Sequence, residues 1–149
     1  MGMRAPDHIT LAVQDPDAAI QFFSLLGFEK SHVALIAGGE PAAYMGLPDM
    51  TADHITLTLE GADPPFEIQL LHFHDLDGQT PEAGPSHHRR LGFNHLAFQV
   101  DDVPAMADRL VAEGVEMISP EMDYISRKLR FFAGPEGITL ELVERDDPS

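Results

Sequence analysis

Two histidines, a glutamine and a glutamate in this sequence have the types and spacing of a divalent-metal site. His8 and His95 occupy the second position of two similar segments, DHITLAVQD and NHLAFQVDD, which lie 87 positions apart (95 − 8). Gln69 and Glu141 are related in the same way by the segments FEIQLL and ITLELV, at an offset of 72 (141 − 69). Imidazole nitrogens together with carboxylate or amide oxygens suit Zn, Ni, Co, Mn or Fe(II). The sequence has no cysteine, so a thiolate site is excluded.

The matched segments indicate an internal duplication. The offset of 87 also relates Gly27 to Gly114 and Glu29 to Glu116, so the similarity continues beyond the first strand-like segment. Self-similarity at a fixed spacing predicts two copies of one structural unit. Because the offset falls from 87 to 72, the first half contains 15 additional residues (87 − 72), and the long segment before His54 has room for them.

Each half is expected to fold as a strand, a helix and three further strands. Residues 7–13 alternate between apolar and polar types, as in a strand with one buried face. Asp15-Pro16-Asp17 then favours the start of a helix, and Gly27 favours its end. In the first half we predict a helix at 18–26, strands at 28–37, 54–59 and 66–73, and a long loop at 38–52. In the second half we predict a helix at 103–113 and strands at 93–100, 116–119, 128–133 and 138–143.

The two faces of these strands differ in composition. One face is apolar and is expected to pack against the helices. The other face carries polar side chains in both halves, namely His8, Gln14, Glu67, Gln69, His95, Gln99, Thr139 and Glu141. Since metal-binding residue types recur at matched places, we predict a curved face around a ligand rather than a flat, solvated one.

Length, composition and charge narrow the class of protein. A chain of 149 residues with 44% hydrophobic and 23% charged residues fits one globular domain, or two small modules sharing a core. Its 25 acidic and 9 basic residues give a formal net charge of −16. Such a surface repels phosphate backbones and anionic lipid headgroups, which disfavours nucleic acid and membrane partners. The N-terminal segment lacks the apolar core of a signal peptide, so we expect a cytoplasmic protein.

Four segments in the order DHITLAVQDPDAAIQFFSLLGF, IQLLHF, FNHLAFQVDDV and FFAGPEGITLELVE resemble the vicinal oxygen chelate superfamily. That superfamily includes glyoxalase I, methylmalonyl-CoA epimerase, extradiol dioxygenases and bleomycin-resistance proteins. The resemblance implies an α+β fold in which two tandem βαβββ modules form a U-shaped mixed sheet around one metal ion, with the helices outside. It covers nearly the whole chain as one domain, 1–149, with module one at about 5–74, a linker at 75–91 and module two at about 92–145.

The resemblance also implies roles for individual residues. The metal ligands would be His8, Gln69, His95 and Glu141, and glutamine at the second ligand position is found among epimerase-like members. The protein would be a glyoxalase- or epimerase-like lyase or isomerase, in which one divalent cation chelates two neighbouring oxygens of a small substrate and stabilises an enediolate. Either Glu141 or Glu67 would move the proton. The resemblance also implies a homodimer, because modules of this kind can pair between two chains as well as within one chain.

Two other functions stay open at this point. An Fe(II)-dependent extradiol-type dioxygenase would use His8, His95 and Glu141 as a facial triad and leave Gln69 uncoordinated. A non-catalytic small-molecule binding protein, as in antibiotic resistance, would use the cavity without a metal ion. The intact set of ligand types makes this third hypothesis the least favoured.

Several further residues compete for roles in the site. Glu67 is the rival of Gln69 as second ligand, because it lies on the same strand face two residues away. Arg127 is a scarce positive charge close to a cavity-forming strand, and therefore a candidate substrate contact. His54 repeats the DHITL segment outside the duplication register, so a structural role is the preferred interpretation. Four histidines around the linker are expected in solvated loops: His72, His74, His87 and His88.

Overall fold

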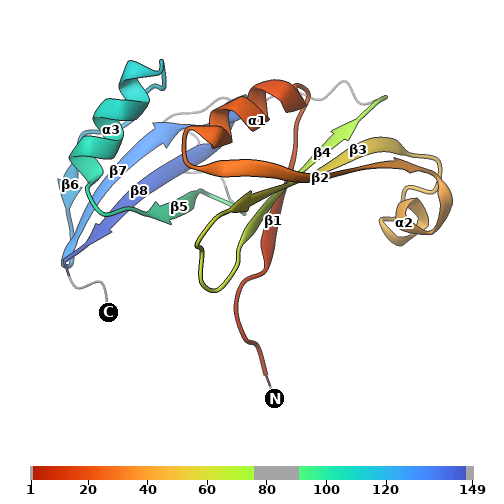
Figure 1. Cartoon of the computed structure of the whole chain (residues 1–149), viewed down its shortest axis with the longest axis horizontal. Helices are drawn as coiled ribbons and strands as arrows, with labels where there is room; N and C mark the ends of the chain where they lie inside the picture. Colours follow the sequence, from red (N-terminus) through yellow and green to blue (C-terminus); the bar gives the residue numbers. More distant parts are fainter. Residues whose placement is uncertain (1, 76–90, 147–149) are drawn as a thin grey trace. The chain divides into compact units, whose positions relative to one another are not determined.

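The chain forms two units, residues 1–79 and 80–149, and each is built on one four-stranded sheet (Figure 1). The computed structural model describes residues 2–75 and 91–146. The predicted linker at 75–91 falls almost wholly outside these residues, as do His87 and His88.

The first unit follows the predicted order of elements. It contains β1 (His8–Ala12), α1 (Pro16–Ser24), β2 (Phe28–Ala37), α2 (Gly39–Tyr44), β3 (Thr51–Leu59) and β4 (Glu67–Phe73). The order in the sheet is β1-β4-β3-β2, with β1 parallel to β4 and the other neighbours antiparallel. The first strand and the last strand of the unit are therefore neighbours in space.

The second unit repeats this topology. It contains β5 (Leu96–Gln99), α3 (Val103–Ala112), β6 (Met122–Asp123), β7 (Arg127–Ala133), a short 3₁₀ helix (Pro135–Gly137) and β8 (Thr139–Arg145). The order in the sheet is β5-β8-β7-β6, again with the first and last strands parallel. Two βαβββ modules in an α+β fold are thus confirmed.

The strand registers match between the units as the two sequence offsets require. Thr10 pairs with Gln69 in the first sheet, and the equivalent residues Ala97 and Glu141 pair in the second. A register slip of one residue would move every side chain to the opposite face of the sheet. The matching registers therefore place Gln69 and Glu141 at equivalent positions on equivalent faces.

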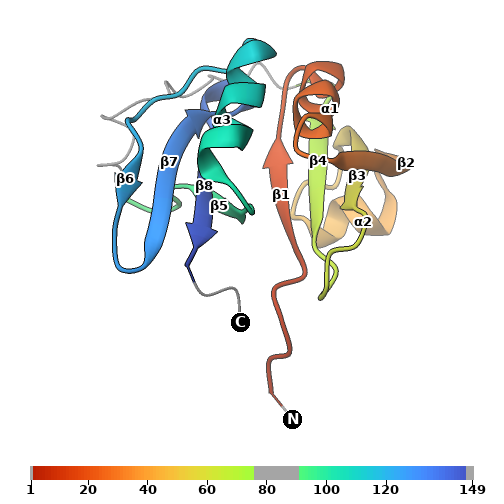
Figure 2. The same ribbon diagram turned by 60° about the vertical axis from the view of Figure 1, so that its left-hand side comes forward.

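One helix covers one face of each sheet (Figure 2). The helices begin alike, since the Oδ1 atoms of Asp15 and Asp102 accept hydrogen bonds from Ala18 N at 3.0 Å and Ala105 N at 2.9 Å. Helix α1 contacts β2 and β4, and α3 contacts β7 and β8. The fully buried side chains between helix and sheet include Phe23, Ile68, Leu70, Leu110, Leu140 and Leu142. The apolar face of each sheet is covered in this way. In the second unit the opposite face carries no helix, and in the first unit the short helix α2 packs at one end of the opposite face, where Ala42 contacts Ala52 and Phe73.

Helix α2 lies inside the segment for which we predict a long loop, so that prediction is wrong for Gly39–Tyr44. Pro41 lies in the first turn, where its missing N–H removes no helical hydrogen bond. Ala42 is completely buried and packs with Met50 and Ala52. A single helical turn of small residues, held by contacts distant in sequence, carries too little periodicity to be recognised beforehand.

The prediction of a strand at 116–119 is also wrong. This segment forms only an isolated bridge between Met117 and Phe132 among the described residues, and the fourth strand of the sheet is β6. Strand β6 enters a two-residue hairpin turn in which Ile125 and Ser126 have positive φ values of 47° and 56°. Such turns normally carry Asn or Gly, so this one has no sequence signal.

None of the helices in the described part of the chain has the length and apolar composition that a membrane span needs.

Candidate metal centre

His95 and Glu141 are brought together on the helix-free face of the second sheet. His95 immediately precedes β5, and Glu141 lies in the middle of β8. The Nε2 atom of His95 is 3.5 Å from Oε1 of Glu141, whose residue is only 8% exposed. The ring of Phe131, which pairs with Glu141 across β7 and β8, meets the His95 ring edge to face at 4.9 Å. The ring contact with Phe131 therefore orients His95 beside the Glu141 carboxylate.

Gln69 lies on the corresponding face of the first sheet, within a chain of hydrogen bonds. Its Oε1 atom is 3.0 Å from Nε2 of His54 on β3, and its Nε2 atom donates to Oε1 of Glu67 at 3.1 Å. His8 lies on the neighbouring strand, opposite Glu67 in the register of β1 and β4. The first unit thus places His8, Glu67 and Gln69 on one half-buried face.

Glu67 fixes the orientation of the Gln69 amide. An ionised carboxylate only accepts hydrogen bonds, so the NH₂ group of Gln69 must face Glu67 and the carbonyl oxygen must face His54. His54 then donates from Nε2. His54, for which the sequence favours a structural role, is the residue that contacts the predicted oxygen ligand.

The donor set fits a divalent metal ion. Two ligand atoms each about 2.1 Å from one cation at a tetrahedral angle lie about 3.4 Å apart, and the separation of His95 Nε2 from Glu141 Oε1 is 3.5 Å. Thr139, which shares the face of Glu141, has a buried hydroxyl with no hydrogen-bond partner in the part of the chain that the structure describes. A polar face with an unsatisfied hydroxyl is suited to a polar ligand.

The described residues of each unit supply only part of a metal centre. In residues 2–75 and 91–146, no three His, Asp or Glu side chains are grouped so that they could hold a metal ion. His8 with Gln69 and His95 with Glu141 are two half-sets of donors on matched faces. Their convergence on one cation stays a prediction.

Arg127 lies on the same face as Glu141 but at the far end of its strand. It follows the β6–β7 turn, is exposed, and is four residues from Phe131, the partner of Glu141. Four residues of strand span about 13 Å. A substrate contact from Arg127 therefore requires a substrate that extends well beyond its metal-binding end.

His72 lies in a strand, and His74 lies in the turn that follows it. His72 is part of β4, and its Nδ1 is 3.1 Å from the carbonyl oxygen of Val13. Nε2 of His74 is 3.0 Å from Oδ2 of Asp53. The prediction of a solvated loop histidine is thus wrong for His72, which is half-buried in β4, whereas the side chain of His74, in the turn after β4, is 41% exposed.

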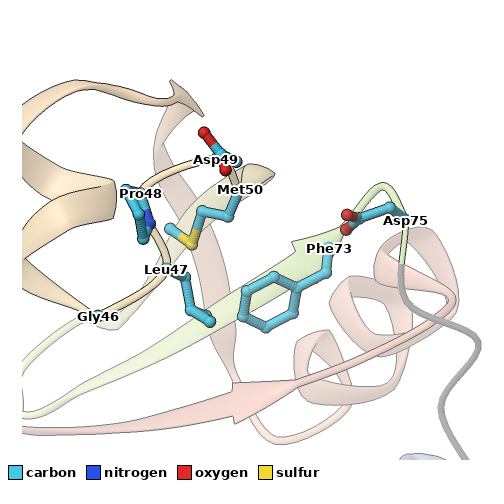
Figure 3. Close-up of a pocket in the computed structure, with 7 residues that line it drawn as sticks. All are labelled: Gly46, Leu47, Pro48, Asp49, Met50, Phe73 and Asp75. Atoms are coloured by element: carbon cyan, nitrogen blue, oxygen red, sulfur yellow. The ribbon is translucent and has the colours of Figure 1, made fainter.

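A cavity of about 430 Å³ lies elsewhere in the first unit (Figure 3). The side chains of Leu47, Met50 and Phe73 form its apolar wall, and Asp49 and Asp75 contribute carboxylates. Residues 46–50 follow α2 and belong to the segment in which the first half has its additional residues. None of the predicted metal ligands lines this cavity.

Comparison with known proteins agrees with the fold. A protein of Escherichia coli K12 named Uncharacterized protein YaeR is 36% identical over 66 residues, covering 44% of this chain and 51% of that protein. Lactoylglutathione lyase of Schizosaccharomyces pombe is 24% identical over 145 residues, covering 93% of this chain and 44% of that enzyme. The chain spans about half the length of these two relatives.

Structural similarity extends over almost the whole chain. The crystal structure of a glyoxalase family protein from Bacillus cereus superposes with a TM-score of 0.81 at 25% sequence identity, covering 97% of this chain and 96% of that one. The model of the Glyoxalase/Bleomycin resistance protein/Dioxygenase superfamily matches residues 5–142. The chain belongs to this superfamily.

Proposed function

We propose that this protein is a divalent-metal-dependent lyase or isomerase of the glyoxalase or epimerase type, acting on a small substrate with two neighbouring oxygens. The observation that carries the proposal is the proximity of His95 Nε2 and Glu141 Oε1, at 3.5 Å on the polar face of the second sheet. The matched position of His8 and Gln69 in the first unit supplies the other half of the donor set. The similarity to lactoylglutathione lyase agrees with this reaction class.

The metal ligands in this proposal are His8, Gln69, His95 and Glu141. When bound, a divalent cation supplies a Lewis acid that stabilises negative charge on substrate oxygens. Glu67 accepts the proton from the substrate carbon at one of its carboxylate oxygens, while Oε1 keeps the Gln69 amide oriented. Glu141 is the second candidate for this proton transfer.

Two measurements test the proposal. Protein purified without chelators is expected to contain one equivalent of a divalent metal by elemental analysis. In D₂O, the loaded protein is expected to exchange the proton on the carbon beside the carbonyl in one of a panel of α-hydroxyketones and 2-methyl-acyl thioesters, followed by ¹H NMR. Protein with bound metal that exchanges none of these protons would contradict the proposal.

One observation favours a second candidate, an Fe(II)-dependent dioxygenase. The Oε1 atom of Gln69 is engaged with His54 at 3.0 Å, so His8, His95 and Glu141 would remain as two imidazoles and one carboxylate. Oxygen consumption with a catechol and the ferrous protein separates the two functions. Steady uptake that depends on Glu141 would favour the dioxygenase.

The other properties that the sequence suggests are part of the same proposal. They are a homodimer, a location in the cytoplasm, and a substrate contact from Arg127. Sedimentation analysis of the metal-loaded protein tests the first of these.

A further inference from the structure

Each of the two predicted metal-binding histidines is held by the side chain of the residue before it. Nδ1 of His8 is 2.6 Å from Oδ1 of Asp7, and Nδ1 of His95 is 2.7 Å from Oδ1 of Asn94. Asp7 and Asn94 are equivalent in the duplication, at the same offset of 87 that relates His8 to His95 (94 − 7). The same ring nitrogen is thus engaged in the same way in both units.

In the contact between Asp7 and His8, the donor of the hydrogen bond can be identified. The Asp7 carboxylate only accepts, so Nδ1 of His8 carries the hydrogen and donates it. In the neutral imidazole, Nε2 is then the atom with the lone pair. The equivalent contact at His95 has the same direction with the Asn94 amide oxygen as acceptor, which agrees with the orientation of that amide in the structure.

The geometry around His95 is suited to a cation at Nε2. With the hydrogen on Nδ1, the lone pair of Nε2 lies 3.5 Å from a carboxylate oxygen of Glu141. Two acceptor atoms at this distance repel each other unless a cation or a proton lies between them. Asn94 therefore orients the imidazole so that its lone pair and the Glu141 oxygen are directed to a common point.

Folding stability does not account for the contact between Asp7 and His8. The side chains of His8 and Asp7 are 39% and 86% exposed. Exposed pairs of this kind contribute little to the free energy of unfolding, because water screens the charges and the side chains lose conformational entropy. An equivalent contact occurs in both units, each time at the histidine on the polar side of the sheet. This repetition is better explained by ligand binding.

We propose that Asp7 and Asn94 are positioning residues of the metal centre. Each fixes the Nδ1–H tautomer of the following histidine and presents Nε2 to the cation, as hydrogen-bond partners of metal-bound histidines commonly do. This inference rests on the proposed function. It adds a difference between the units: the partner of His8 is a carboxylate, whereas the partner of His95 is a neutral amide.

Metal affinity tests the inference without reference to activity. Zn²⁺ binding is measured by competition with a chromophoric chelator for the wild-type protein and for Asp7→Ala, Asp7→Asn, Asn94→Ala and Asp108→Ala. The alanine variants at 7 and 94 are expected to bind about 10- to 100-fold more weakly. Asp7→Asn is expected to stay within about 5-fold of the wild type, since it installs the partner that His95 already has.

Asp108→Ala is the matched control for charge. Asp108 is exposed on α3 and belongs to neither half-set of donors, so this variant removes one carboxylate and is expected to bind Zn²⁺ as the wild type does. Wild-type affinity in both Asp7→Ala and Asn94→Ala would overturn the inference and leave the proposed function standing. A wild-type protein that binds no stoichiometric Zn²⁺ would instead overturn the proposed function.

A second measurement stays informative if a variant folds poorly. In the metal-free wild-type protein, ¹⁵N NMR of the imidazole rings at a pH where they are neutral distinguishes the two tautomers. His8 and His95 are expected to carry the hydrogen on Nδ1. The Nε2–H tautomer at both histidines would overturn the inference.

Discussion

Glu67 and Gln69 are joined by a hydrogen bond along one strand, from the Gln69 amide nitrogen to a carboxylate oxygen of Glu67, at 3.1 Å. Both residues were rivals for the same ligand position on sequence grounds, because their side chains share one face of β4. This hydrogen bond indicates different roles for Glu67 and Gln69. Glu67 orients the amide, and Gln69 presents its oxygen on the side of His54.

Replacing Gln69 is expected to weaken metal binding, whereas replacing Glu67 is expected to affect proton transfer. Gln69→Ala removes a donor oxygen, so we expect at least a 10-fold loss of Zn²⁺ affinity. Glu67→Gln keeps a hydrogen-bonding side chain at that place and should bind Zn²⁺ nearly as the wild type does. If Glu67 is the base, kcat for proton exchange should fall about 10²- to 10⁴-fold.

The opposite pattern would reverse the assignment. Undiminished Zn²⁺ affinity in Gln69→Ala, with a large loss in Glu67→Gln, would make Glu67 the second ligand. His54→Ala is the control for the hydrogen-bond chain, since it removes the partner of the Gln69 oxygen without removing a proposed ligand.

The two N-cap residues are expected to contribute equally to stability. Asp15 and Asp102 accept backbone hydrogen bonds of 3.0 and 2.9 Å at the starts of α1 and α3. Replacing either with alanine leaves helix N–H groups without a partner and should lower the free energy of unfolding by about 1 kcal/mol. Urea denaturation followed by circular dichroism measures the effect.

The exposed helix residue Asp108 provides the control for the caps, because it makes no capping bond. Asp108→Ala is expected to change the free energy of unfolding by less than about 0.5 kcal/mol. Equal stability of Asp15→Ala and the wild type would show that the cap at α1 is dispensable.

The sequence carries enough information to predict the order of the helix and strands along each unit and the faces of the strands. Alternation and duplication place His95 with Glu141, because a period of two and a matched register leave little freedom in a sheet. The contact of His54 with Gln69 is different. It depends on how β3 aligns with β4, and an identical DHITL segment outside the duplication register gives no indication of that alignment.

The hydrogen-bond partners of His8 and His95 show a second limit of prediction from the sequence. Asp7 and Asn94 are visible in the aligned segments, but neighbouring residues in a strand point to opposite faces. Their contacts with Nδ1 arise because the strands begin only at His8 and Leu96, so the residues before them are free of that alternation. Strand ends are where patterns of residue types are least informative.

Gly134 is expected to resist substitution for steric reasons. A Cβ atom added there would lie 2.9 Å from Cδ1 of Leu140 and 3.1 Å from the carbonyl oxygen of Ile138. Its φ of −86° is accessible to any residue, so the expected loss of stability comes from steric crowding and not from backbone strain. Gly134→Ala should lower the free energy of unfolding by about 1–3 kcal/mol, measured by urea denaturation.

A double variant separates crowding from other effects at Gly134. Leu140→Val removes the atom that the new Cβ would meet first, so adding Gly134→Ala to Leu140→Val should cost less than adding it to the wild type. Fully additive costs would contradict the steric explanation.

Thr139 is expected to tolerate loss of its hydroxyl. The side chain is 1% exposed, and Oγ1 has no hydrogen-bond partner in the described part of the chain. An unsatisfied buried hydroxyl costs about 1–3 kcal/mol, so the isosteric change Thr139→Val should leave the free energy of unfolding unchanged or raise it. Thr139→Ser, which keeps the hydroxyl and removes a buried methyl group, should lower it by about 1 kcal/mol.

Thr139 also offers a test of the polar face as a binding surface, since it lies two residues from Glu141 on β8 and corresponds to Glu67 in the duplication. If the hydroxyl contacts substrate, Thr139→Val should raise KM while the protein stays fully stable and binds Zn²⁺ as the wild type does. An unchanged KM would mean that the substrate contacts other residues of this face and not the Thr139 hydroxyl. A loss of stability in Thr139→Val greater than about 1 kcal/mol would instead mean that Oγ1 has a hydrogen-bond partner in the folded protein.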